Sequence, residues 1–135
     1  MTASFSFRID RAHGLVRIKM AGLFTPADIE AFLEARRRAH AELGCAPNQH
    51  MTLNDLSGMK IQSQEAVARF RDMLADPAYR SRRLAFVAGR TLARSQLSRA
   101  LDGRDNARFF DSVEAAEAWL LDEAPAVQPQ RTATG

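Results

Sequence analysis

The sequence has one cysteine, one tryptophan and one tyrosine among its 135 residues, and it has no long apolar run. A single cysteine, Cys45, excludes an intrachain disulfide, and nothing beside it in the sequence would activate its thiol for catalysis. No apolar stretch approaches the roughly 20 residues that span a bilayer. The N-terminus lacks the basic and apolar blocks of a secretion signal. These absences predict a soluble cytoplasmic protein with no membrane span.

The common motifs of catalysis and metal binding are also missing. His13, His40 and His50 are far apart in the sequence and lack the paired spacing of metal ligands. There is no glycine-rich phosphate loop, no serine-hydrolase elbow and no nucleophile next to a base. We therefore expect no enzyme, no metal and no cofactor, although a site assembled from distant residues would leave no such motif.

Arginine supplies nearly all the positive charge of a chain whose net charge is +3. An arginine-rich surface can bind nucleic acid or another anion. Here, however, acidic residues are interspersed and no aromatic residues alternate with the arginines as base-stacking platforms would. The pattern favours arginines on solvated helix faces, in a protein of arginine- and alanine-rich composition, and no nucleic-acid partner.

The periodicity of apolar residues predicts an α/β fold. Alternating segments over 5–10 and 15–20, joined by a turn over 11–14 that ends at Gly14, predict an N-terminal hairpin. Helices are then expected after Thr25, from Ser63, over 91–101 and after Asp111, with strands over 50–56, 83–89 and 106–110. This order predicts a single open mixed sheet of about five strands covered by about four helices. Residues 1–124 form the expected domain, and 125–135 a disordered tail.

Four short stretches of the sequence carry a family resemblance, at residues 15–22, 52–58, 84–89 and 109–120. On these the chain resembles the STAS superfamily, which includes sulfate-transporter cytosolic domains and anti-sigma-factor antagonists. Within it, the chain is most similar to the small bacterial SpoIIAA-like branch, from about Phe5 to Leu121. The resemblance implies the fold first, and then a non-enzymatic regulatory module that docks a protein partner.

The connection after the third expected strand is the predicted site, because open α/β sheets bind their ligands at the carboxyl ends of strands. In anti-sigma-factor antagonists, this turn carries a serine that a partner kinase phosphorylates. The run from Asp55 to Gly58 matches only its upstream part, and Ser63 is the serine nearest the modified position. Ser63 also suits a helix N-cap, and the N-cap alone explains it well. The predicted site residues are Asp55, Ser57, Gly58, Met59, Lys60, Ile61 and Ser63.

Within this predicted site, Ser57 and Gly58 are expected to shape a turn, and Asp55 to hydrogen-bond the loop. Met59, Lys60 and Ile61 either form the lip of a partner site or, in the case of Ile61, close the core. The branch is also similar in outline to lipid-carrying CRAL-TRIO domains. That likeness implies the alternative function, a carrier or sensor of a small apolar or anionic ligand that the helix over 91–101 would gate. A homodimer is compatible with either hypothesis.

Overall fold

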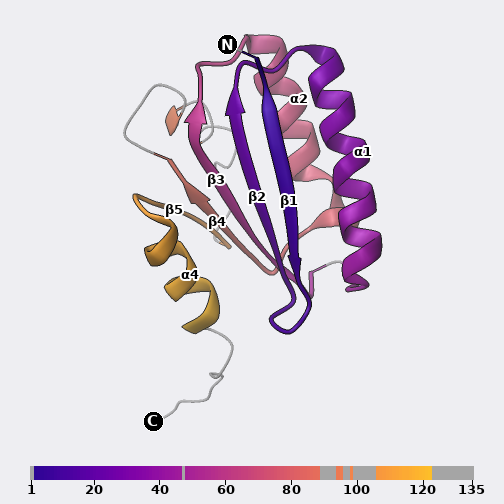
Figure 1. Cartoon of the computed structure of the whole chain (residues 1–135), viewed down its shortest axis with the longest axis vertical. Coiled ribbons are helices and arrows are strands. Elements are labelled where there is room, and N and C mark those ends of the chain that lie inside the picture. The colour runs from indigo at the N-terminus through magenta and orange to yellow at the C-terminus, as the bar shows by residue number, and fades with distance from the viewer. Residues whose placement is uncertain (1, 47, 89–93, 96–97, 99–105, 123–135) are drawn as a thin grey trace.

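The computed structural model describes residues 2–46, 48–88, 94, 95, 98 and 106–122, and it shows one five-stranded sheet with helices on both faces (Figure 1). The strands are β1 (Ser4–Asp10), β2 (Leu15–Gly22), β3 (Met51–Met59), β4 (Arg83–Val87) and β5 (Ala107–Phe110). The α-helices are α1 (Pro26–Leu43), α2 (Gln64–Ala75) and α4 (Val113–Asp122), and the 3₁₀ turn η1 (Pro77–Tyr79) follows α2.

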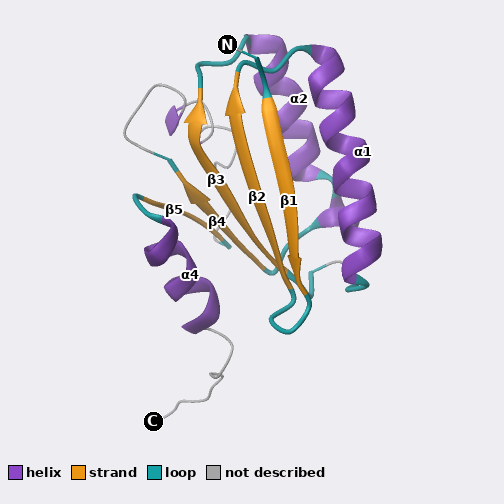
Figure 2. Cartoon of the chain, in the orientation of Figure 1, coloured by secondary structure: helices purple, strands orange, loops and turns teal. Residues whose placement is uncertain are grey.

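The sheet has the strand order β1-β2-β3-β4-β5, in which β1 is antiparallel to β2 and all other neighbours are parallel. Helices α1 and α2 lie on one face and α4 lies on the other (Figure 2). The prediction of a single mixed sheet with an N-terminal hairpin is therefore confirmed.

Three α-helices, not about four, are present in the part of the chain that the structure describes. The helix expected over 91–101 lies outside the described residues except at 94, 95 and 98. The domain end expected at 124 and the tail over 125–135 also lie outside them.

Local signals in the sequence explain where the helices begin and end. Thr25 and Asp28 form a capping box at the start of α1, and Gly44 ends that helix with a left-handed φ of 76°. Ser63 caps α2 by accepting a hydrogen bond from a backbone amide of the first turn. The last helix begins one residue later than the sequence predicted, because Ser112, which follows Asp111, accepts the capping hydrogen bond from the Ala115 amide.

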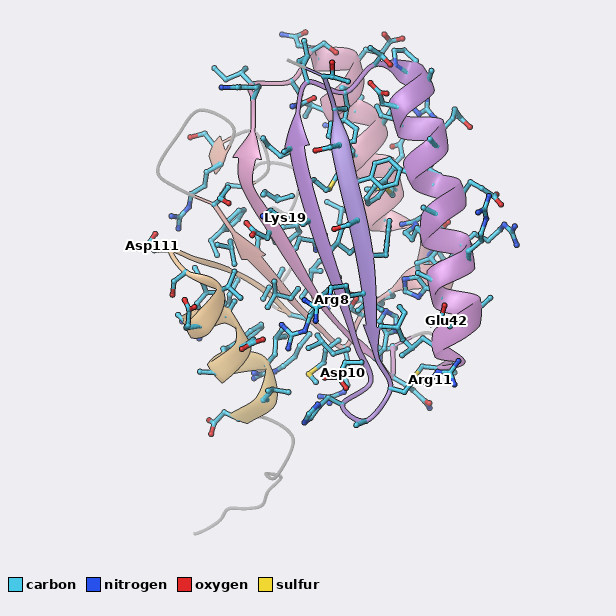
Figure 3. All side chains as sticks on the ribbon, in the orientation of Figure 1. Arg8, Asp10, Arg11, Lys19, Glu42 and Asp111 are labelled. Atoms are coloured by element: carbon cyan, nitrogen blue, oxygen red, sulfur yellow. The ribbon has the colours of Figure 1, made fainter. Side chains whose placement is uncertain are left out.

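Each face of the sheet has its own apolar core. On the α1 and α2 side, Phe32 and Phe70 pack over strand residues that include Ile18 and Phe86. On the other side, Leu120 and its neighbours in α4 cover part of β2, β3 and β4. The exposed Arg8 and Lys19 lie on paired strands at the edge of this second face, which explains why β1 alternates polar and apolar residues (Figure 3).

Candidate functional site

Strand β3 continues through the segment that the sequence predicted to be a turn. Gly58 and Met59 pair with Ala21 and Gly22 of β2 after a shift of register. A Cβ atom on Gly58 would lie 2.8 Å from the Cβ atom of Ala21, so the glycine permits close approach of two strands. The prediction that Ser57 and Gly58 shape a turn is wrong, because both belong to the strand.

Asp55 and Ser57 form a local pair on this strand. The carboxylate oxygen Oδ1 of Asp55 accepts hydrogen bonds from the Ser57 amide at 3.1 Å and from the Ser57 hydroxyl at 2.7 Å. Leu56 between them packs into the core on the α1 and α2 side, so Asp55 and Ser57 face the opposite side of the sheet. The structure therefore separates them from Ile61 and Ser63, with which they were expected to form one site.

The connection from β3 to α2 is short and exposes one large apolar side chain. Met59 packs against the core, whereas Lys60 is exposed. Ile61 is 53% exposed, so it does not close the core. Ser63 is exposed, and its hydroxyl accepts the Ala66 amide at 3.1 Å, as expected of an N-cap.

Gln62 joins this connection to the one that precedes α1, a role that the sequence analysis missed. Its buried amide accepts a hydrogen bond from the Phe24 backbone and donates to the carbonyl oxygens of Gly22 and Lys60, at 2.9, 3.0 and 2.6 Å. Leu23, which is 45% exposed, lies in the joined segment. We call the surface formed by Leu23, Lys60, Ile61 and Ser63 the docking edge.

A second cluster, also missed, lies under α1 at the opposite end of the strands. A cavity of about 50 Å³ is bordered by α1, β3 and the segment from η1 to β4. Thr52 and Ser81 lie in its wall with their hydroxyl oxygens 2.7 Å apart. The Ser81 hydroxyl is also 3.3 Å from Nε2 of His50, which is only 1% exposed. Because α1, β3 and the segment from η1 to β4 together line the cavity, no local motif could have revealed the cluster.

Arg36 and His40 bring positive charge and a second imidazole to this cavity from α1. The Arg36 guanidinium lies 4.1 Å from the centre of the Tyr79 ring and donates to the Met73 carbonyl at 3.1 Å. Burial lowers the pKa of His40 to about 4, and the nearby His50 and Arg36 act in the same direction. Burial also lowers the pKa of His50, against the opposing effect of a backbone carbonyl. Both shifts favour the neutral form of the imidazole.

Among the residues that the structure describes, no group of three or more His, Cys, Asp or Glu side chains is arranged to hold a metal ion. No helix in the same ranges is both long and apolar enough to cross a bilayer.

Comparison with known proteins gives a fold. No family model matches the sequence, and no curated protein matches it either. The structure is similar to that of an uncharacterised protein of the DUF3478 family from Shewanella loihica PV-4, which has a SpoIIAA-like fold. The TM-score is 0.68 at 18% sequence identity, and the match covers 87% of this chain and 93% of that one. The chain has a SpoIIAA-like fold, as its resemblance to that branch predicted.

Proposed function

We propose that this chain is a cytoplasmic, non-enzymatic, STAS-like regulatory module that binds a protein partner through the docking edge. The observation that carries the proposal is the position of its exposed apolar side chains. Leu23 and Ile61 are the two large apolar residues that are exposed in the described parts of the chain. Both lie at the carboxyl ends of adjacent parallel strands, where α/β sheets place their ligands.

The chemistry of the docking edge suits a protein partner. Interfaces are held largely by a few apolar or aromatic side chains that become buried, within a polar rim. Here Ile61 and Leu23 supply the apolar centre, and Lys60 supplies a flanking positive charge. Burying an isoleucine side chain contributes up to about 1.5–3 kcal/mol, so replacing Ile61 should have a large effect on a weak complex. The edge is also held in place, since Gln62 fixes its two segments to one another.

The test is purification of the tagged protein from its own cells, followed by identification of the proteins bound to it. We expect Leu23→Asp/Ile61→Asp to lose a partner that the wild type retains. Ala118→Asp is the matched control, because Ala118 is also exposed but lies on α4, on the other face of the sheet. Retention of the same partners by the Leu23/Ile61 variant would refute the proposal.

The variant Ser63→Asp distinguishes a regulatory role of Ser63 from a role in capping the helix alone. Aspartate caps helices about as well as serine does, so this variant should fold normally while it adds the negative charge of a phosphate mimic. If phosphorylation of Ser63 regulates docking, Ser63→Asp loses the partner and Ser63→Ala retains it. Equal binding by both variants would assign Ser63 to the helix cap alone.

The second candidate function is a carrier or sensor of a small apolar or anionic ligand. The cavity under α1 favours it, and its arginine and hydroxyl groups favour an anion over an apolar molecule. Native mass spectrometry of protein purified from its own cells tests this candidate by detecting any small molecule that stays bound.

A further inference from the structure

The cavity under α1 has the chemistry of an anion site. Among its lining residues are a guanidinium from Arg36, two hydroxyls from Thr52 and Ser81, and an amide from Asn54. The side chains of Thr52, Asn54 and Ser81 are buried, so these polar groups are removed from bulk solvent. Arg80, which is exposed, also lines the cavity, so the cavity reaches the surface.

Arg36 brings to this cavity a charge that the Tyr79 ring and the Met73 carbonyl compensate only in part. Its side chain is only 11% exposed, and the Asp76 carboxylate, 3.9 Å away, is too distant for a hydrogen bond. Nε of Arg36 is buried and has no hydrogen-bond partner among the described residues. A buried N–H group without an acceptor is rare in folded proteins, and a buried cation is costly unless it is paired. Both features point to an acceptor that carries negative charge.

The electrostatic surroundings favour the same kind of ligand. The charged groups that face the two imidazoles and Arg36 are Arg80, Arg82 and Asp76. Positive charge therefore predominates. Burial is the main reason that the pKa values of His40 and His50 are lowered, and positive charge, from Arg36 at His40 and from Arg82 at His50, acts in the same direction. A field that opposes an additional cation stabilises an anion at the same place.

The volume limits the size of the ligand. A cavity of about 50 Å³ has room for roughly three water-sized groups. Carboxylate and phosphate both match the fork of N–H groups on a guanidinium, and the smallest carboxylates fit this volume better than a tetrahedral phosphate does. We propose that this cavity binds a small carboxylate anion of the size of formate or acetate, with Arg36 as its principal ligand. This inference gives the second candidate function a ligand class, and its test requires no partner at the docking edge.

The test is a titration of the isotope-labelled protein with sodium formate, followed by nuclear magnetic resonance. Sodium gluconate replaces formate to keep the ionic strength constant, since gluconate carries the same charge and is too large for the cavity. We expect saturable shifts of the Arg36 Nε–Hε signal and of the Thr52 and Ser81 amides with formate alone. The wild-type Arg36 signal reports directly on the proposed ligand, so this result does not depend on any variant.

Two variants complete the experiment. Arg36→Gln should weaken formate binding by at least ~10-fold, the effect of losing a charge-assisted hydrogen bond. Arg69→Gln is the control, because Arg69 pairs with Glu30 on the surface and its loss changes the net charge equally. Its formate affinity should equal that of the wild type.

Other outcomes would overturn the inference. Shifts that do not saturate, or that gluconate also produces, would mean that formate acts through general surface electrostatics. Unchanged Arg36 signals would place any bound anion elsewhere. The Leu23→Asp/Ile61→Asp variant should bind formate normally. Failure of the docking proposal would show in partner retention, whereas failure of the anion proposal would show in the formate titration.

Discussion

Acidification from pH 7 to pH 5 should destabilise this protein through His40. The His40 ring on α1 packs against the rings of His50 and Tyr79, with centroids 4.6 and 4.9 Å apart. Burial is the main reason that the pKa of His40 falls from 6.5 to about 4. Because this pKa is higher in the unfolded chain, the unfolded chain takes up a proton first as the pH falls. The stability due to neutral His40 is thus present above pH 6.5 and is lost as the pH falls towards 4.

Proton linkage gives the size of the effect. A group with these two pKa values loses about 2 kcal/mol of stability between pH 7 and pH 5. Partial exposure of the ring to solvent reduces the expected loss to roughly 1 kcal/mol. The buried His50, whose pKa is also lowered, adds to the loss in the same direction. Aspartate and glutamate side chains ordinarily titrate below this window, so they contribute little to the change.

The assay is urea denaturation at pH 7, 6 and 5, followed by circular dichroism. The wild type should lose roughly 1 kcal/mol of unfolding free energy across this range. His40→Phe, which keeps an aromatic ring against His50 and Tyr79, should lose at most about half as much. Arg37→Gln, an exchange on the exposed side of the same helix, should behave as the wild type does. If the wild type and His40→Phe lost equal amounts of unfolding free energy, burial would not be what lowers the pKa of His40.

Three substitutions test the packing and the caps, each by urea denaturation at pH 7. Gly58→Val should destabilise the protein by about 1–3 kcal/mol because of its clash with Ala21, and adding Ala21→Gly should recover part of the loss. Ser63→Ala should cost about 1 kcal/mol by removing the cap of α2, whereas no loss would mean that water caps the helix equally well. Phe32→Ala should cost about 3–5 kcal/mol because its ring is fully buried, and a cost below about 1 kcal/mol would contradict this core.

The sequence predicted those parts of the fold that depend on neighbouring residues. Thr25, Gly44 and Ser63 act on their own backbone or on the next turn, so their residue types alone located the helix ends. Alternation of apolar and polar residues identified the strands because it too depends only on residues that are neighbours in the sequence. Gly58 misled the prediction, because a glycine suits a turn and a close approach of two strands equally well, and only the pairing with Ala21 distinguishes them.

The candidate sites were less predictable because they depend on residues that are distant in the sequence. The docking edge was predicted at Lys60, Ile61 and Ser63, but Leu23 joins it only through the strand pairing and the side chain of Gln62. The cavity was not predicted at all. Arg36 resembled any arginine on a solvated helix face, and its burial results from the position of η1 beside α1.

The side chain of Gln62 couples the starts of α1 and α2 through its hydrogen bonds to Gly22 and Phe24. A protein that displaces residues 60–63 must either carry residues 22–24 with them or break buried hydrogen bonds, at a cost of about 1–3 kcal/mol for each group left unsatisfied. Because α1 extends from this junction to Arg36 and His40, a shift of the helix would reach the wall of the cavity. We therefore expect a partner bound at the docking edge to alter the affinity of the cavity for its anion. By thermodynamic reciprocity, the bound anion would then alter the affinity for the partner by the same factor.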